Sequence, residues 1–190
     1  MRIILLGAPG SGKGTQGEAL ARHFDVRHVS TGDLLRAHIV EGTELGQLAA
    51  PYVQRGELVP DDLMLQVAGS AVAEAAQEGG YVLDGFPRTL AQAERAYELA
   101  GPADITADAV VYLAVPDDVV RERLAHRAVD GRVDDSDPEV IERRLKVFHE
   151  ETEPLLDFYR NRGILVTLDA SPPPNDVTAA MLDAVKALRS

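Results

Sequence analysis

Short, nearly unbroken runs of apolar residues alternate along the chain with longer stretches in which apolar residues recur at helical spacing. Five short runs rich in β-branched residues are predicted to be strands: 3–7, 27–30, 81–85, 109–115 and 164–169. These runs lack the strict apolar–polar alternation of a strand with one face in water. They therefore indicate a parallel sheet that is covered on both faces.

The stretches between these runs are predicted to be helices. They are 12–24, 61–77, 89–100 and 117–128, with a closing helix inside 172–188 behind a run of prolines. The stretch that begins at Asp117 follows Pro116 and has acidic residues in its first turn, which favours a helix start. Alternating strands and helices predict an α/β, three-layer fold in which helices cover both faces of a five-stranded parallel sheet.

Two stretches do not continue this alternation. Residues 30–59 have two helical patterns and no strand, and residues 128–137 form a short polar stretch rich in charged and turn-forming residues. We therefore predict a core of residues 1–29, 60–127 and 138–190, into which two small mobile lobes are inserted.

Composition narrows the classes of function. The chain has 190 residues and a formal net charge of −12, which suits one compact domain and argues against a general nucleic-acid or anionic-membrane surface. Cysteine is absent, which excludes disulfides and thiolate metal sites. The apolar run at the N-terminus is too short for a membrane span or a signal peptide, so we expect a cytoplasmic protein.

The stretch GAPGSGKGTQ, residues 7–16, indicates a phosphate-binding loop. The general pattern is Gly, four residues, then Gly-Lys and a hydroxyl residue. Gly12 and Lys13 fit it, but Gly14 stands where the hydroxyl is expected and Thr15 comes one place later. The loop follows a predicted strand and precedes a predicted helix. In that context its glycines let backbone N–H groups converge on a polyphosphate at the helix N-terminus.

A second motif, YVLDGFPRT at residues 81–89, ends the third predicted strand. Asp84 would lie at the carboxyl end of the sheet, where open α/β sheets bind ligands, and a carboxylate there can hold Mg²⁺, mostly through water. The turn after it would carry Arg88 across the same crevice. A simpler alternative is a strand–helix joint in which Asp84 only caps the helix.

Together these motifs resemble the adenylate kinases of the nucleoside monophosphate kinase family. The resemblance covers nearly the whole chain, through GAPGSGKGTQ, STGDLLR (30–36), GELVPD (56–61), LDGFPRTLAQA (83–93) and RLKVFHEETEPLLDFY (144–159). The family's own loop reads Gly-Lys-Gly-Thr, so the loop here is an intact variant. The resemblance implies a monomer that uses Mg²⁺ and converts ATP and AMP into two ADP by direct in-line transfer.

The resemblance also implies an AMP site in the lobe 30–59 and beside the second motif. Thr31 and Arg36 match AMP-contacting positions, and Arg36 and Arg88 match the arginines on the AMP phosphate. Gln92 matches the glutamine that recognises adenine. The remaining implied AMP-site residues are Glu57, Leu58, Val59, Gly85, Arg132 and Arg144.

On the ATP side, the resemblance implies Gly10, Ser11, Gly12, Lys13, Gly14 and Thr15 of the loop, together with Arg123 and Arg127 on one helix face. The implied catalytic residues are Lys13, Arg88, Arg132 and Arg144. Arg143 competes with Arg144 for its assignment. Asp134 and Asp135 match carboxylates that organise a lid. The lid here resembles the short form of the family and has no Cys, so a structural zinc is not expected.

Other interpretations stay open. A UMP or CMP kinase would share the fold, although Thr89 after the motif arginine and the nearby Gln92 favour AMP over a pyrimidine. A nucleotide-dependent switch would need a base-reading Asn-Lys-x-Asp, which the chain lacks. It would also leave Arg36, Arg88 and Gln92 without a role. Each arginine alone could be a solvated surface charge, but the set at matching positions is hard to explain that way.

Overall fold

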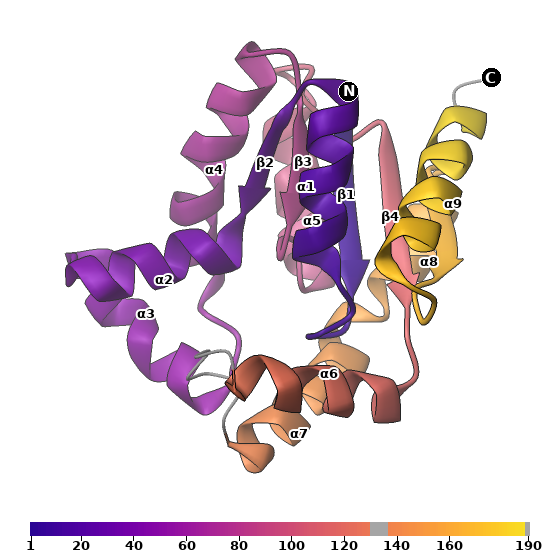
Figure 1. Ribbon diagram of the computed structural model, residues 1–190. Coiled ribbons are helices and arrows are strands. Elements are labelled where there is room, and N and C mark those ends of the chain that lie inside the picture. Colours follow the sequence, from indigo (N-terminus) through magenta and orange to yellow (C-terminus); the bar gives the residue numbers. More distant parts are fainter. Residues whose placement is uncertain (130–136, 189–190) are drawn as a thin grey trace.

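A five-stranded, all-parallel sheet forms the centre of the protein (Figure 1). The computed structural model describes residues 1–129 and 137–188. The strands lie in the order β2-β3-β1-β4-β5 and are β1 Arg2–Gly7, β2 Arg27–Ser30, β3 Tyr81–Asp84, β4 Ala109–Ala114 and β5 Leu165–Asp169. Each coincides with a predicted apolar run to within one residue at either end. The predicted α/β fold is therefore confirmed.

Helices surround the sheet in the predicted segments and in one further region. They are α1 Lys13–Phe24, α2 Thr31–Glu41, α3 Glu44–Arg55, α4 Asp61–Gln77, α5 Leu90–Ala100, α6 Asp117–Val129, α7 Pro138–Val147, a π-helical turn η2 Phe148–Thr152, α8 Leu155–Arg160 and α9 Pro174–Ala187. The helical region 138–160 was not among the predicted helices. In addition, α6 continues through Val129, two residues into the stretch that we predicted to be a loop.

Side chains of β1 alternate between two buried cores. Ile3 and Leu5 pack with residues of α1 and α9, whereas Ile4 and Leu6 pack with residues of α4 and α8. All four are nearly inaccessible to water, and full burial of such a side chain stabilises the fold by roughly 1.5–3 kcal/mol. Burial on both sides explains why β1 is an apolar run without alternation.

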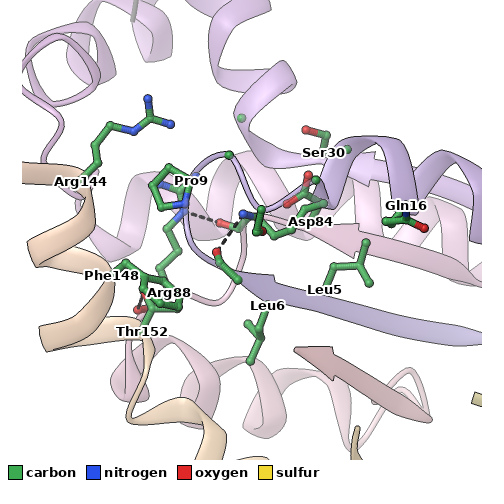
Figure 2. A pocket seen from close by; sticks show the side chains of 18 of the residues that line it. Leu5, Leu6, Pro9, Gln16, Ser30, Asp84, Arg88, Arg144, Phe148 and Thr152 are labelled. Atoms are coloured by element: carbon green, nitrogen blue, oxygen red, sulfur yellow. Dashed lines mark hydrogen bonds between the residues drawn. The ribbon is translucent and has the colours of Figure 1, made fainter. Parts of the chain in front are cut away.

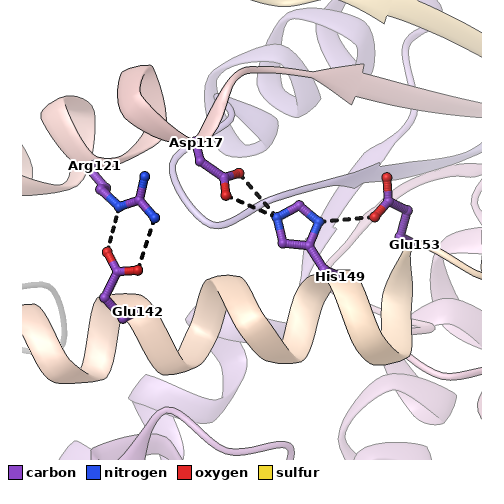
Figure 3. Close-up of polar contacts among 5 residues, drawn as sticks. All are labelled: Asp117, Arg121, Glu142, His149 and Glu153. Carbon is purple, nitrogen blue, oxygen red and sulfur yellow. Dashed lines mark hydrogen bonds and ion pairs between the residues drawn. The ribbon is translucent and has the colours of Figure 1, made fainter.

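A set of polar contacts fastens α6 to α7 and η2 (Figure 3). Arg121 of α6 donates from Nε and Nη2 to the two carboxylate oxygens of Glu142, at 2.5 and 2.9 Å. His149 of η2 lies between two carboxylates, with Nδ1 3.0 Å from Glu153 Oε2 and Nε2 3.1 Å from Asp117 Oδ1. Both carboxylates raise the pKa of His149. α6 is thus held against the segment that carries Arg144.

No helix within the described ranges is both long and apolar enough to cross a membrane.

Candidate active site

One continuous cleft opens at the carboxyl ends of the strands, where parallel sheets bind ligands. Its volume is about 890 Å³. This lies near the upper end of the range of roughly 300–1,000 Å³ that is usual for small-molecule sites. Both predicted nucleotide sites contribute to its walls, which come from the β1–α1 loop, α2, residues 56–59, the β3–α5 loop, α6, α7 and residues 170–174.

The β1–α1 loop has the backbone of an anion cradle. Gly10 and Gly12 have φ angles of 80° and 96°, in the left-handed region that suits glycine. Gly12 is also the N-cap of α1, whose first turn contains no acidic residue. The positive end of the helix therefore faces the cleft without a competing carboxylate. The predicted loop residues from Gly10 to Thr15 all line the cleft.

Lys13 supplies the positive charge of this loop. Its Nζ donates to the carbonyl oxygens of Gly7 at 2.8 Å and Ala8 at 2.9 Å. Burial and, to a smaller extent, the charges of nearby arginines lower the pKa of Lys13 to about 8, although the Asp84 carboxylate opposes this shift. A negatively charged ligand beside Nζ would offset both effects and favour the ammonium form.

Asp84 lies at the end of β3, paired with Ser30 of β2 and Leu5 of β1, and only 9% of it is exposed. Within the described part of the chain, no three His, Asp or Glu side chains cluster as a metal-binding group. A single carboxylate inside the cleft fits Mg²⁺, because this ion keeps several waters and takes further oxygen ligands from phosphates.

Three arginines reach the cleft from α2, the β3–α5 loop and α7 (Figure 2 shows Arg88 and Arg144). Arg88 donates from Nε to the Gly85 carbonyl at 2.7 Å, and its own carbonyl accepts from Thr152 Oγ1 at 2.8 Å. Burial lowers the pKa of Arg88, and Arg144 lowers it further. Arg36 of α2 also lines the cleft and pairs with Asp33 at 2.5 Å. Like charges held this close repel each other, and an anion between them would relieve that repulsion.

The structure separates the two neighbouring arginines that the sequence could not separate. Arg144 lines the cleft. Arg143 points to the end of α3 instead, where it donates to the Arg55 carbonyl at 3.3 Å and lies 3.8 Å from Glu57. Successive residues on a helix point about 100° apart, so only one of the two can face the cleft.

Two arginines of α6 line the cleft from one helix face, as their i and i+4 spacing predicted. Arg123 donates from Nη2 to the carbonyl oxygens of Ala170 at 2.9 Å and Ser171 at 3.1 Å. This contact fixes α6 against the loop before α9, which forms the outer wall of the cleft. Arg127 lines the cleft one turn further along α6.

The predicted acceptor residues are distributed between the cleft wall and the layer behind it. Residues 57–59, Gly85 and Gln92 line the cleft. Thr31 instead lies beneath the lining, fully buried, and its hydroxyl donates to the Asp84 carbonyl at 3.2 Å. Gly85 has φ 85°, and a Cβ there would lie 2.6 Å from Thr31 Oγ1, so the close approach of these segments requires glycine.

One residue next to the site was missed by the sequence interpretation. Asp61, at the start of α4, accepts a hydrogen bond of 2.7 Å from Nε2 of Gln92. Thr89 caps α5 by accepting from Gln92 N at 3.1 Å, and this Thr-x-x-Gln spacing is a capping-box signature that the sequence displays. The partnership with Asp61 has no such local signal. The predicted residues Arg132, Asp134 and Asp135 lie outside the described residues.

Comparison with known proteins adds a second line of support. The family model described as adenylate kinase matches residues 5–164. The chain is 44% identical to an adenylate kinase of Thermobifida fusca, over 98% of both chains. It is also 44% identical to one from a Cyanothece species, over 99% of this chain and 96% of the relative, and 43% identical to one from Stenotrophomonas maltophilia, over 98% and 100%.

Proposed function

Since this chain belongs to the adenylate kinase family, we propose that it transfers the γ-phosphoryl group of Mg²⁺-ATP directly to AMP, giving two ADP. One observation carries the proposal. A single cleft is lined both by a phosphate loop with its lysine and by arginines from four other segments. Such a cleft can hold a donor and an acceptor phosphate next to each other, which direct transfer needs.

The donor triphosphate binds along the β1–α1 loop. The backbone N–H groups of this loop and of the N-terminus of α1 donate hydrogen bonds to the phosphate oxygens. Lys13 exchanges its contacts with the Gly7 and Ala8 carbonyls for contacts with the outer phosphates. Arg123 and Arg127 border the nucleotide from α6. The prolines at 172–174 also line the cleft, and the Pro174 carbonyl accepts a hydrogen bond of 2.9 Å from Gln16 Nε2 of α1.

The acceptor AMP binds between α2 and the β3–α5 loop. Arg36 and Arg88 take its phosphate, since a planar guanidinium offers two aligned donors and keeps its charge at any working pH. Gln92 lies 1% exposed at the base end of this wall, beside the apolar residues Leu58 and Val59. Thr31 acts from behind the wall, by holding the Asp84 carbonyl.

Phosphoryl transfer is accelerated mainly by stabilisation of the negative charge on the transferring group. Lys13, Arg88 and Arg144 surround the place where the phosphoryl group moves, and Arg132 is proposed to join them. Burial of this cluster strengthens its interaction with the negative charge that spreads over the phosphoryl oxygens. When bound, Mg²⁺ supplies further positive charge to the phosphates, and Asp84 is the residue that would hold it.

ADP formation from Mg²⁺-ATP tests the proposal, with AMP, UMP, CMP and GMP offered one at a time. We expect rapid ADP formation with AMP and little with the others. Transfer to UMP or CMP instead would keep the fold and overturn the base assignment. Failure of every acceptor to react would refute a kinase function and favour a nucleotide-dependent switch.

The monomeric state and the cytoplasmic location expected from the sequence remain predictions. Analytical ultracentrifugation of the purified protein, with and without nucleotides, tests the first of these.

A further inference from the structure

The side-chain amide of Gln92 is held from two sides. Its Oε1 accepts from the backbone N–H of Arg88 at 2.8 Å, and its Nε2 donates to Asp61 Oδ1 at 2.7 Å. The Arg88 N–H can only donate, and an ionised Asp61 carboxylate can only accept. The amide therefore has one favoured orientation, because a flipped amide would set donor against donor and acceptor against acceptor.

This fixed orientation leaves Gln92 with a defined set of hydrogen-bonding groups for a ligand. A primary amide has two N–H donors and an oxygen that accepts two hydrogen bonds. One donor and one acceptor position are used by Asp61 and Arg88, so one of each remains. Gln92 lines the cleft, which makes it the residue through which this remaining pair meets the acceptor base.

Purines differ in the pattern that they present in return. The 6-position of adenine has an amino group that donates, next to a ring nitrogen that accepts. In the 6-oxopurines, hypoxanthine and guanine, this pattern is reversed, since the 6-oxygen accepts and the neighbouring ring N–H donates. If the position of the base is fixed by the phosphate of the nucleotide and by the cleft walls, the Gln92 amide can form hydrogen bonds with a 6-oxopurine edge only after it flips.

We propose that Asp61 is a positioning residue that selects a 6-aminopurine acceptor over a 6-oxopurine by preventing the amide of Gln92 from flipping. This inference rests on the proposed function, because it assigns Gln92 to the acceptor base. Asp61 is outside the cleft lining and acts only through Gln92. Arg88 N–H provides the second restraint, so removal of Asp61 weakens the selection without abolishing it.

A purely structural role for Asp61 makes a different prediction. Asp61 and Asp62 both lie in the first turn of α4, where either carboxylate favours the helix N-terminus. Both residues are exposed. Asp62 therefore matches Asp61 in charge, exposure and helix position, and the structure gives it no hydrogen bond to Gln92. Asp62→Asn is the matched control.

The test compares AMP with IMP, which differ only at the 6-position and its adjacent ring nitrogen. The values of kcat/KM for both acceptors are measured at saturating Mg²⁺-ATP in the wild type, Asp61→Asn and Asp62→Asn. An Asn at position 61 can present either its oxygen or its NH₂ group and so accepts both amide orientations. We expect the AMP-to-IMP ratio to fall about tenfold in Asp61→Asn, the equivalent of one lost restraint of ~1.4 kcal/mol.

The ratio should stay at the wild-type value in Asp62→Asn. KM for AMP should rise in Asp61→Asn with little change in kcat, because Gln92 contacts the base and not the phosphoryl group. An unchanged ratio in Asp61→Asn would overturn the inference, as would an equal fall in both variants. Asp61→Ala, which removes the acceptor altogether, decides the question in the same way if Asp61→Asn does not fold.

The outcomes separate the inference from the function on which it rests. A wild type that makes no ADP from AMP refutes the proposed function and the inference together. A wild type that prefers AMP, combined with an Asp61→Asn variant of unchanged ratio, refutes the inference alone.

Discussion

Replacement of Arg88 by alanine should separate catalysis from stability. Arg88 lines the cleft, where its Nε donates to the Gly85 carbonyl and its own carbonyl accepts a hydrogen bond from Thr152 of η2. In phosphoryl-transfer sites, an arginine that meets the transferring group contributes about 10³-fold or more to the rate. We therefore expect kcat to fall by about that factor in Arg88→Ala.

The effect of the same change on folding should be small. The Gly85 carbonyl loses one donor, and an average hydrogen bond contributes ~1 kcal/mol. In return, the repulsion between Arg88 and its neighbours Arg144 and Arg36, which lowers the pKa of Arg88, disappears. The contact with Thr152 uses the backbone carbonyl and survives the substitution. The net change in the free energy of unfolding should stay within ~1 kcal/mol.

Coupled-assay turnover and urea denaturation measure these two quantities in one preparation. Arg95→Ala is the matched control, since Arg95 lies on α5 next to the motif, is exposed and forms an ion pair with Glu98. Its turnover should equal that of the wild type. Near-normal turnover in Arg88→Ala would refute the role of Arg88, and loss of the folded state would refute the view that its charge is a cost to stability.

Three further predictions follow from the geometry. Gly85→Ala should destabilise the protein by about 1–3 kcal/mol in urea denaturation, because alanine is strained at φ 85° and its Cβ would lie 2.6 Å from Thr31 Oγ1. A wild-type midpoint would contradict this account. The raised pKa of His149 means that its two carboxylate contacts stabilise the fold fully below the unfolded pKa, and that this stability is lost as the pH rises through the folded pKa. The stability difference between wild type and His149→Gln should therefore be largest near pH 6, at no more than ~1 kcal/mol because the ring is partly exposed, and should decrease as the pH rises. A difference that grows with pH would be inconsistent with these contacts. Finally, bound ATP should raise the pKa of Lys13 from about 8 toward its ordinary value. Titration calorimetry at pH 8.5 in two buffers of different ionisation enthalpy should then detect proton uptake on binding. A binding enthalpy that does not depend on the buffer would argue against a phosphate beside Nζ.

The three central strands, β1, β3 and β4, were predictable from the sequence because consecutive residues in each of them are buried. β4, for example, is buried at Ala109, Val110 and Val111 in succession, so its apolar run needs no knowledge of the neighbouring strands. The region 138–160 was harder. η2 inserts a π-helical turn between α7 and α8, which interrupts the helical period just where Phe148 packs against Val120 and Leu124. A pattern based on one period does not reveal such a segment.

The candidate site likewise has a part that the sequence predicts and a part that depends on the fold. The phosphate loop is local, so ten consecutive residues identify it, whereas the choice between Arg143 and Arg144 depends on how α7 is rotated about its axis. That rotation is set by Ile141 and Leu145, which are buried in one cluster with residues of α6. Both lie on the same face of α7 as Arg144, which lines the cleft, whereas Arg143 points to the end of α3. Asp61 and Gln92 are 31 positions apart and on different helices. Their contact forms only when α4 and α5 pack on the same face of the sheet. A residue that orients another side chain across such a distance has no local sequence signal, so it is the hardest part of a site to predict from one sequence.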